Sequence, residues 1–461
     1  MSLGTGIRLT DLIAAICFIL ALKGLTSPKT ARYGNLLGAG GMAVAVGITF
    51  ATNGLTHFLL IVGAMVIGAV IAVPAARLVK MTAMPQMVAA FNGVGGGAAA
   101  LIALATFLRA PAGSLAVYQV VEVLFGVVVG CVSFSGSCMA FAKLQELMTG
   151  RPVTYPGQQL LNGIVAVAVL GLSVAVCVST ANWLITIILV LALAFGVAFV
   201  LPIGGADVPV LISLLNSFTG LAVAASGFVL HSVVLVVAGT LVGASGTLLT
   251  QMMSRAMGRS LPNILFSAFG AVITATGGAE GDTTRTVKSA SAEDVAILLA
   301  YANKVIVVPG YGLAVAQAQH TIRELADLLE SRGVEVIYAI HPVAGRMPGH
   351  MNVLLAEANV PYEQLKEMDE ANPEFASADV ALVVGANDVV NPAAKNDPAS
   401  PIYGMPIMEV DQARNVIFMK RSMRPGFAGI DNELLFGPKT TLLFGDAKDS
   451  LTKVVAAVKA L

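Results

Sequence analysis

The sequence is poor in charged residues, in aromatic residues and in cysteine. Of its 461 residues, 12% are charged and 6% are aromatic, whereas soluble domains carry roughly 25% charged residues. This shortage of charge excludes an ordinary soluble protein over the whole length. Basic and acidic residues balance at 27 each, so the net charge gives no sign of a nucleic-acid partner.

All four cysteines fall in apolar segments, and residues 261–461 contain none. The four are Cys17, Cys131, Cys138 and Cys177. Their distribution excludes a disulfide framework and shows no spacing typical of a metal site. It fits a second part of the chain that faces a reducing compartment.

Charge divides the chain into two parts. Residues 1–260 hold 11 basic and 4 acidic residues (balance +7), and residues 261–461 hold the remaining 16 basic and 23 acidic residues (balance −7). In the first part, nine segments reach the roughly 20 apolar residues that a membrane helix needs. They lie at about 6–24, 34–52, 56–76, 85–108, 115–137, 162–180, 183–201, 209–230 and 232–253. We therefore expect a polytopic α-helical domain over residues 1–259, embedded in a lipid bilayer.

The basic residues of the short connecting loops predict the orientation. Alternate loops carry Lys23, Lys29, Arg32, Arg77, Lys80, Lys143, Arg151, Arg255 and Arg259, and the opposite side carries only Arg8 and Arg109. Because cytoplasmic loops are enriched in lysine and arginine, we expect the N-terminus outside and the C-terminal part in the cytoplasm.

Two segments of the membrane part resemble one another at an offset of 124 residues. Residues 84–92 and 208–216 each place a proline second and an asparagine last, and a glycine follows in each at the same distance. The matching positions are Pro85 and Pro209, Asn92 and Asn216, Gly96 and Gly220. The copies begin the fourth and eighth spans, so they run in the same direction. Such a parallel repeat predicts a pseudo-axis along the membrane normal.

Several polar side chains fall inside the predicted spans. Asn92 and Asn216 lie near 10 Å into their helices at 1.5 Å per residue, where an amide faces the bundle interior or a wet cavity. Hydrogen bonding between helices is an equally good interpretation. A carboxylate such as Glu122 more often marks an ion or proton path, whereas Asp207 suits a helix cap. Of the serines from Ser133 to Ser137, only some share a face, and back-bonding is the default for serine.

Residues 260–286 lack apolar periodicity and predict a linker, and residues 287–461 predict one further domain. Lys304–Val308 predicts a buried strand, a Gly310-x-Gly312 turn follows, and a helix should run to about Ser331 before a second strand. Val315 stands where a third glycine often occurs. The glycines permit the turn and let a pyrophosphate approach the helix N-terminus, which indicates a Rossmann-like, dinucleotide-binding domain with a parallel sheet.

The ends of the predicted strands favour NADP(H) over NAD(H). An acidic residue usually ends the second strand and holds the 2′-hydroxyl of NAD, but here the strand ends at Ile340 and His341 follows. A later strand, Val416–Met419, leads into Lys420, Arg421, Ser422 and Arg424. Three cations and a hydroxyl suit a 2′-phosphate. A solvated basic loop is the alternative interpretation.

Two further loops are candidates for ligand binding. The buried strand Val380–Val384 is followed by the polar segment 385–392, and ligands bind at the carboxyl ends of such strands. The alternative is a turn dictated by glycine, asparagine, aspartate and proline. In the long loop 341–350, Arg346 is placed to reach a phosphate.

Together these features resemble the beta subunit of the proton-translocating NAD(P) transhydrogenase, over essentially the whole chain. The motifs that carry the resemblance are residues 309–319, 341–352, 385–394 and 420–422, with the Asn216 segment and Gly136-Ser137 in the membrane part. The resemblance implies a Re/Si-specific oxidoreductase and translocase. In it, hydride passes between NAD(H) on a partner alpha subunit and NADP(H) bound by this chain, coupled to proton translocation. It also implies that the protein lies in a bacterial inner membrane, that its alpha subunit can be divided into a soluble and a small membrane chain, and that the whole complex forms a homodimer.

The resemblance also assigns residues. Cofactor binding falls to Gly310, Tyr311, Gly312, Ala314, Val315, Arg346, Gly385, Ala386, Asn387, Asp388, Lys420, Arg421, Ser422, Gly426, Phe427 and Ala428. Asn387, Asp388 and Asn391 are the catalytic candidates near the nicotinamide, and residues 426–428 form a lid. The residues that the resemblance assigns to the proton path are Asn92, Glu122, Ser137, Asp207 and Asn216. The sequence departs from the family in two places. Some members carry a titratable histidine at Asn92, so Glu122 or a partner's histidine must supply that step, and Phe427 replaces a tyrosine.

Two other functions fit the same features less fully. A transporter or channel gated by a nucleotide-sensing domain would also show a parallel repeat and buried polar residues. A membrane dehydrogenase that reduces quinone would need a flavin or metal centre, and residues 261–461 offer no cysteine and only three histidines, His320, His341 and His350.

Overall fold

The computed structural model describes residues 3–51, 57–111, 114–148, 153–179, 182–204, 207–257, 260–266, 287–346, 349–397, 400, 402–426 and 428–461. The chain forms two compact units, Met1–Thr250 and Gln251–Leu461. Of the predicted linker, residues 261–266 form the short helix α10 (Leu261–Phe266). Residues 267–286 lie outside the described residues, as do Arg151, Arg259 and Phe427.

The first unit is a set of long helices. In the described part of the chain they are α1 (Leu3–Gly24), α2 (Pro28–Ala51), α3 (Phe58–Leu78), α4 (Met84–Arg109), α5 (Val117–Leu144), α6 (Gln158–Val178), α7 (Asn182–Val200), α8 (Val208–Val229) and α9 (Val233–Ala256), with the 3-10 turn η1 (Met81–Ala83) before α4. Eight of them, α2 to α9, are long and apolar enough to cross a membrane. The predicted polytopic membrane domain is thereby confirmed.

Helix α5 is longer than predicted and contains Lys143. It continues seven residues past the expected end at 137, to Leu144, so Lys143 does not lie in a loop as predicted. Its side chain is only 3% exposed. The Nζ atom donates to the carbonyl oxygens of Val200, Leu201 and Ile203 at 3.0, 2.7 and 2.6 Å. The Val200 and Leu201 carbonyls also accept from the amides of Ile203 and Val153, and the buried ammonium adds a second, charged donor at this helix end.

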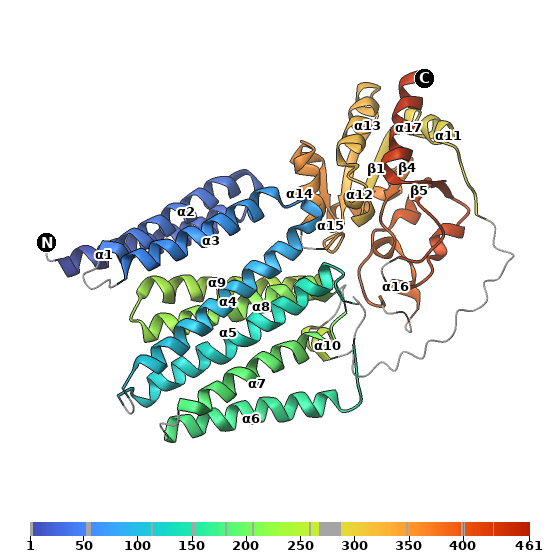
Figure 1. The fold of residues 1–461 in the computed structure, drawn as a ribbon. Coiled ribbons are helices and arrows are strands. Elements are labelled where there is room, and N and C mark those ends of the chain that lie inside the picture. Colours follow the sequence, from blue (N-terminus) through green and yellow to red (C-terminus); the bar gives the residue numbers. More distant parts are fainter. Residues whose placement is uncertain are drawn as a thin grey trace. The chain divides into compact units, whose positions relative to one another are not determined.

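Helices α4, α5 and α8 pack closely against one another (Figure 1). A Cβ atom added at Gly130 of α5 would lie 2.7 Å from the carbonyl oxygen of Gly96 on α4. One added at Gly96 would lie 3.0 Å from the Cβ of Ser133. Small residues allow this close approach, and it brings the polar groups of the three helices together.

The predicted repeat has a structural counterpart. Helices α4 and α8 begin at equivalent residues, and each has a proline in its first turn. Gly220 of α8 packs on α9, where an added Cβ would lie 2.4 Å from the amide nitrogen of Gly243, as Gly96 of α4 packs on α5. Each copy therefore uses the same glycine position to approach the next helix.

The second unit is built on a six-stranded, fully parallel sheet. Its strands are β1 (Lys304–Pro309), β2 (Glu335–Ile340), β3 (Leu365–Glu367), β4 (Val380–Val384), β5 (Asn415–Lys420) and β6 (Thr440–Phe444). They lie in the order β3-β2-β1-β4-β5-β6. The central strands are almost wholly buried runs of apolar residues, as expected where both faces of a parallel sheet are covered. The predicted Rossmann-like sheet is confirmed.

Helices and short turns cover the two faces of the sheet. Helices α11 (Ala292–Ala300), α13 (Gln319–Ser331) and α17 (Ala447–Ala460) lie side by side (Figure 1). The other elements are α12 (Tyr311–Val315), α14 (His350–Glu357), α15 (Met368–Ala371), α16 (Ala393–Asn396) and the 3-10 turns η4 (Tyr362–Gln364), η5 (Asn372–Ser377), η6 (Asp388–Val390), η7 (Val410–Gln412) and η8 (Glu433–Phe436). A buried core that includes Ile306, Phe375 and Phe418 lies between the sheet and the turns η5 and η8.

Candidate functional site

The strand order changes direction between β1 and β4, and ligands bind to α/β sheets at such a point. A cleft of about 550 Å³ opens there, at the carboxyl ends of the strands. It is lined by Gly312, Val315, Ala316, Gly385, Ala386, Asn387, Met419, Lys420, Arg421, Ser422, Arg424, Pro425, Gly426, Gly445, Asp446 and Ala447. The lining comes from the segments after β1, β4, β5 and β6.

Glycines allow the turns after β1 and β4 to touch. The amide of Gly310 donates to the Val384 carbonyl and that of Gly312 to the Gly385 carbonyl, both at 2.9 Å. A Cβ at Gly310 would lie 2.4 Å from the Gly385 oxygen, and one at Gly312 would lie 2.6 Å from the Gly385 Cα. Any side chain at these positions would force the two turns apart. The two amides bond to protein, so the glycines shape the cleft by their small size.

The helix predicted after this turn is interrupted. Helix α12 ends at Val315, Gln317 has a left-handed φ of 52°, and α13 begins at Gln319. The amide of Ala318 donates to the Leu313 carbonyl, which is the six-to-one bond of a Schellman cap. The prediction of one continuous helix was wrong, because a glutamine here takes the cap position that glycine usually occupies.

Lys420 joins the segment after β5 to the segment after β4. Its Nζ atom donates to the Oδ1 atom of Asn387 at 2.9 Å, and the Nδ2 atom of Asn387 donates to Asp388 Oδ1 at 2.9 Å. The second oxygen of Asp388 accepts from the Ala428 amide at 2.8 Å. Burial lowers the pKa of Lys420, and the charges of Asp388 and Asp431 oppose that effect. The chain of bonds fixes Lys420 on the wall of the cleft.

Arg421, Ser422 and Arg424 continue the same wall and are exposed. None of the ion pairs among the described residues involves either arginine. Together with Lys420, they give the end of β5 three cations. An anion that enters this part of the cleft meets two arginines that form no ion pair with a described carboxylate.

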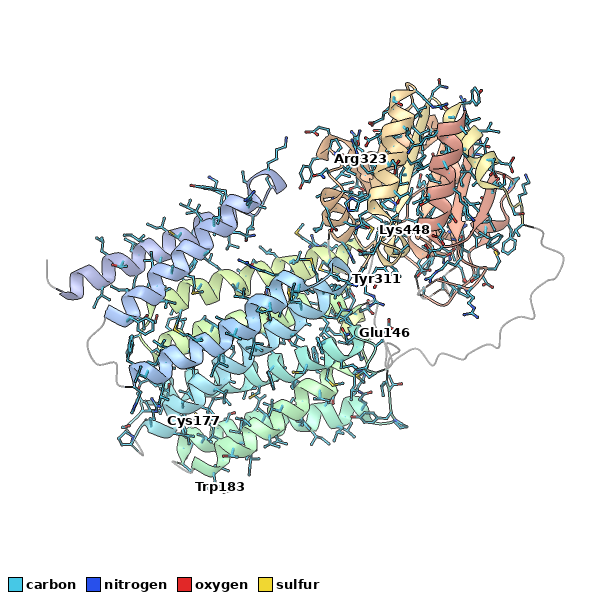
Figure 2. The ribbon with its side chains drawn as sticks, turned by 45° about the horizontal axis from the view of Figure 1, so that its top comes forward. Glu146, Cys177, Trp183, Tyr311, Arg323 and Lys448 are labelled. Atoms are coloured by element: carbon cyan, nitrogen blue, oxygen red, sulfur yellow. The ribbon has the colours of Figure 1, made fainter. Side chains whose placement is uncertain are left out.

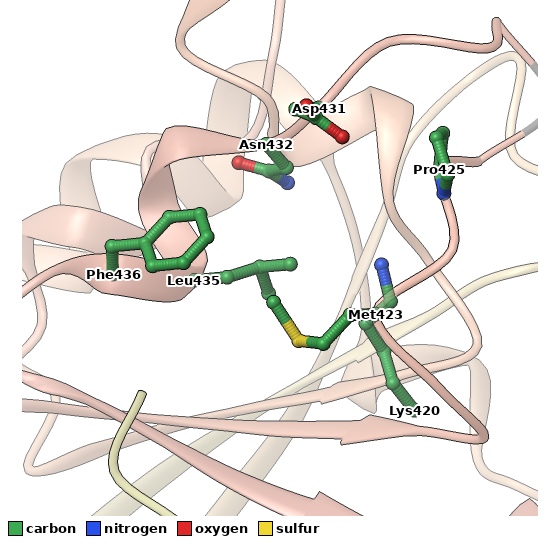
Figure 3. A pocket seen from close by; sticks show the side chains of 7 residues that line it. All are labelled: Lys420, Met423, Pro425, Asp431, Asn432, Leu435 and Phe436. Atoms are coloured by element: carbon green, nitrogen blue, oxygen red, sulfur yellow. The ribbon is translucent and has the colours of Figure 1, made fainter. Parts of the chain in front are cut away.

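A smaller hollow of about 150 Å³ shares Lys420 and Pro425 with the main cleft. Figure 3 shows the seven side chains that surround it, with Met423, Leu435 and Phe436 as its apolar members. Asn432, which also lines this hollow, is hydrogen-bonded to the loop after β4: its Nδ2 atom donates to the Asn387 carbonyl at 3.2 Å. Asn391 is fully buried, and its Nδ2 atom donates to the Asp431 carbonyl at 3.0 Å.

A stack of three side chains connects the carboxyl ends of β1 and β2. The guanidinium carbon of Arg346 lies 4.6 Å from the centre of the Tyr311 ring. That ring contacts His350 edge-on, with 5.9 Å between the centres. Nearby, His341 bonds to the Pro406 carbonyl through Nε2 at 2.8 Å, and burial lowers its pKa to about 4. His341 is therefore a neutral structural residue.

In the membrane part, polar side chains of α4, α5 and α8 meet in one cluster. Asn92 Nδ2 donates to Ser137 Oγ at 2.9 Å and approaches Ser133 Oγ at 3.4 Å. Ser133 donates to the Leu215 carbonyl at 2.8 Å and lies 2.6 Å from Thr219 Oγ1. The Oδ1 atom of Asn92 is buried without a hydrogen-bond partner. The cluster thus holds one amide oxygen that remains able to accept a hydrogen bond.

The remaining polar candidates of the membrane part lie outside this cluster. Ser135 back-bonds to the Cys131 carbonyl at 3.0 Å, as expected for the serine on the other face. Glu122 and Asn216 are half-buried, and Asp207 is buried at the residue before α8. Trp183 and Cys177 lie at one end of the helices, and Glu146 follows α5 at the other (Figure 2).

The matches to known proteins extend over both units of the chain. A family model described as the NAD(P) transhydrogenase beta subunit matches residues 7–457. A protein of Rhodospirillum rubrum named NAD(P) transhydrogenase subunit beta is 50% identical over 455 residues, which cover 97% of this chain and 98% of that protein. A sequence of the same name from a strain of that species matches equally.

The chain belongs to the NAD(P) transhydrogenase beta-subunit family. The predicted family is thereby confirmed, and with it a membrane-bound oxidoreductase subunit that uses nicotinamide nucleotides and has an alpha-subunit partner. Among the described residues no group of histidine, cysteine or acidic side chains is arranged to hold a metal ion.

The cleft of this beta-subunit family member contains nine of the predicted cofactor-binding residues. They are Gly312, Val315, Gly385, Ala386, Asn387, Lys420, Arg421, Ser422 and Gly426. Six others do not line it: Gly310 and Ala314 are buried, Tyr311 contacts Arg346, and Asp388 bonds to Ala428. The role of each stays a prediction.

The segment 445–447 after β6 is the part of the cleft that the sequence reasoning missed. Asp446 caps α17 through a 2.9 Å bond from the Lys448 amide to its Oδ1 atom, and Gly445 precedes it at the strand end. The signal was present, because Gly445 follows a buried strand just as Gly310 and Gly385 do. Applying the strand-end rule to the last strand would have found it.

Proposed function

We propose that this chain binds NADP(H) in the cleft and exchanges hydride with NAD(H) on the alpha subunit, coupled to proton translocation. The reaction moves one hydride, with its two electrons, from C4 of one nicotinamide to C4 of the other. The activity is that of a Re/Si-specific, proton-translocating transhydrogenase in a bacterial inner membrane. The alpha subunit is divided into a soluble and a small membrane chain, and the complex dimerises.

The observation that carries the choice of NADP(H) is the cationic end of β5. Lys420, Arg421 and Ser422 offer two positive charges and a hydroxyl to a doubly charged 2′-phosphate. At the end of β2, where an acid would hold the 2′-hydroxyl of NAD, the chain has Ile340 and then the neutral His341. The residues present fit NADP(H) and do not provide the acid that NAD(H) requires.

The position of these cations also predicts the direction in which the cofactor lies. With the 2′-phosphate at the end of β5, the cleft leads past Gly385 to Gly312 in the turn after β1, and β2 is the next strand of the sheet. The nicotinamide half then lies over the β1 turn, on the side of Tyr311 and Arg346. This direction is opposite to the usual one, in which the adenosine ribose meets the end of β2.

The resemblance places Asn387, Asp388 and Asn391 near the nicotinamide, and this remains a prediction. The hydrogen bond from Lys420 to Asn387 argues against it for Asn387, because an extended dinucleotide holds its two ends far apart. Asn387 and Asp388 are better suited to holding Lys420 and the segment around Ala428 in place. The 426–428 lid would then close over the 2′-phosphate end.

For the membrane part, we propose a proton path through the cluster around Asn92 and Ser137, with Glu122, Asp207 and Asn216 as further members. The buried Oδ1 atom of Asn92 has no hydrogen-bond partner and can accept a hydrogen bond from a water molecule. Asparagine neither binds nor releases a proton, so a titratable partner residue or Glu122 supplies that step. The positive loops support an N-terminus outside and a cytoplasmic second unit.

A direct test compares cofactor affinities. The full chain in detergent should bind NADP(H) much more tightly than NAD(H), measured by equilibrium titration, and equal affinities would defeat the proposal. The transporter alternative is separated by activity, since a nucleotide-gated transporter moves no hydride. With the alpha subunit added, NADPH should reduce an NAD analogue whose reduced form absorbs at a separate wavelength.

Proton coupling needs a sealed membrane. Proteoliposomes that hold the complex should change their internal pH during turnover, reported by an enclosed dye. An uncoupler should abolish the pH change while hydride transfer continues. Turnover without any pH change would refute coupling and leave the hydride reaction standing.

A further inference from the structure

Tyr311, Arg346 and His350 come from three segments that meet beside the nicotinamide end of the proposed cofactor position. Tyr311 follows β1, Arg346 lies in the loop after β2, and His350 begins α14. Because β1 and β2 are neighbours, the stack joins the ends of two adjacent strands. Arg346 is the cation of this group, and the ring of Tyr311 supports its guanidinium at 4.6 Å.

His350 controls the backbone of Arg346. Its Nδ1 atom accepts a hydrogen bond from the Arg346 amide at 3.0 Å, so the ring proton of the neutral imidazole resides on Nε2. Burial, followed by the charge of Arg346, lowers the pKa of His350 and favours that neutral form. Gly345, at φ 113°, closes the loop over the ring, and a Cβ there would lie 2.6 Å from the His350 Cβ.

The same arrangement is costly for stability. His350 is 1% exposed, and its Nε2 atom has no hydrogen-bond partner. A buried N–H without an acceptor is destabilising, and buried polar groups nearly always find one. A residue that only filled space would be apolar here. Local departures of this kind are expected where function, rather than stability, decides the residue.

We infer that His350 is a positioning residue for hydride transfer: it holds Arg346 on Tyr311, and Arg346 thereby fixes the nicotinamide half of NADP(H). The inference rests on the proposed function. Affinity for the cofactor comes mainly from the 2′-phosphate at the opposite end of the cleft. Loss of the His350 contact therefore leaves the cofactor bound but lets its reacting end move, and a small misplacement of reacting atoms lowers the rate strongly.

Two variants separate the hydrogen bond from the packing. His350→Phe keeps an aromatic ring against Tyr311 and removes the Nδ1 acceptor, while the loss of Nε2 breaks no bond. His350→Asn loses the ring but keeps an acceptor atom near the position of Nδ1. Both are measured in the reconstituted complex with the alpha subunit, by NADPH titration and by the rate of hydride transfer to an NAD analogue.

The expected result is a split between rate and affinity. His350→Phe should lower kcat about tenfold or more while the Kd for NADPH changes less than about threefold. His350→Asn should recover most of the lost kcat. A normal kcat in His350→Phe, an equal loss in both variants, or a loss of affinity that parallels the loss of kcat would each overturn the inference. Failure of the proposed function is seen separately, as a wild-type complex that does not prefer NADP(H).

Discussion

Replacing Lys420 and Arg421 together by alanine should remove the preference for NADP(H) over NAD(H). A charge-assisted hydrogen bond contributes about 1.5–3 kcal/mol. Arg421 is exposed, so solvent screening places it at the lower end. Lys420 is half-buried and held by Asn387, which places it at the upper end. The sum of about 4.5 kcal/mol corresponds to a roughly thousandfold weaker Kd for NADP(H).

NAD(H) provides the internal reference for this experiment, because it lacks the 2′-phosphate. Its Kd should change by less than about threefold in the same double variant. Lys395→Ala is the matched control, since it removes an exposed lysine of the same unit that pairs with Glu409 outside the cleft. Equilibrium titration at two salt concentrations gives the values, and the wild-type preference should shrink as salt screens the exposed charges. A double variant that still discriminates by more than about tenfold would refute this location of the 2′-phosphate site.

Three further changes test other contacts. Lys143→Met removes three hydrogen bonds to carbonyls at the end of α7 and should destabilise the membrane unit by about 3 kcal/mol. Its thermal midpoint in detergent should fall, and that of Lys143→Arg should fall less. An unchanged midpoint in Lys143→Met would contradict the contribution of these bonds. Gly312→Ala places a Cβ 2.6 Å from the Gly385 Cα and should push the turns after β1 and β4 apart. Titration with NADP(H) should therefore show weaker binding than in the wild type. An unchanged affinity would mean that the close contact of these two turns is not needed for binding. The Asn303 amide bonded to Asp379 holds the pKa of that carboxyl below its usual 3.8. Asp379→Asn should therefore cost about 1 kcal/mol at neutral pH. The difference in urea midpoint from wild type should begin to shrink as the pH falls below about 3.8 and should be lost once the pH is below the lowered pKa of the folded protein.

The membrane part was largely predictable because its driving forces are local in sequence. Runs of apolar residues predict spans, and the proline and asparagine of the two repeats predicted equivalent helix starts that the structure also has. The serines show where prediction by pattern stops. Helical geometry separates Ser135 from its neighbours, but only packing shows that Ser133 and Ser137 face Asn92.

Contacts between distant segments account for what the sequence reasoning missed. Lys143 looks like a loop cation until the end of α7 is placed beside it. The break after Val315 depends on a glutamine in a left-handed conformation, which composition does not indicate. In the cleft, the strand-end rule identified the segments after β1, β4 and β5. The hydrogen bond between Lys420 and Asn387 joins two of those segments, and no sequence pattern predicts such a cross-connection.

Helix α5 is fastened by polar bonds along its length. Ser137 binds Asn92 of α4, Ser133 binds the Leu215 carbonyl of α8, and Lys143 binds the last carbonyls of α7. Sliding α5 by even one residue would break these bonds together in an environment with few replacement partners. We therefore expect these four helices to keep their mutual positions if helices shift during turnover. A displacement on the scale of a helical turn is then expected at the boundaries where α4, α5, α7 and α8 meet the other helices.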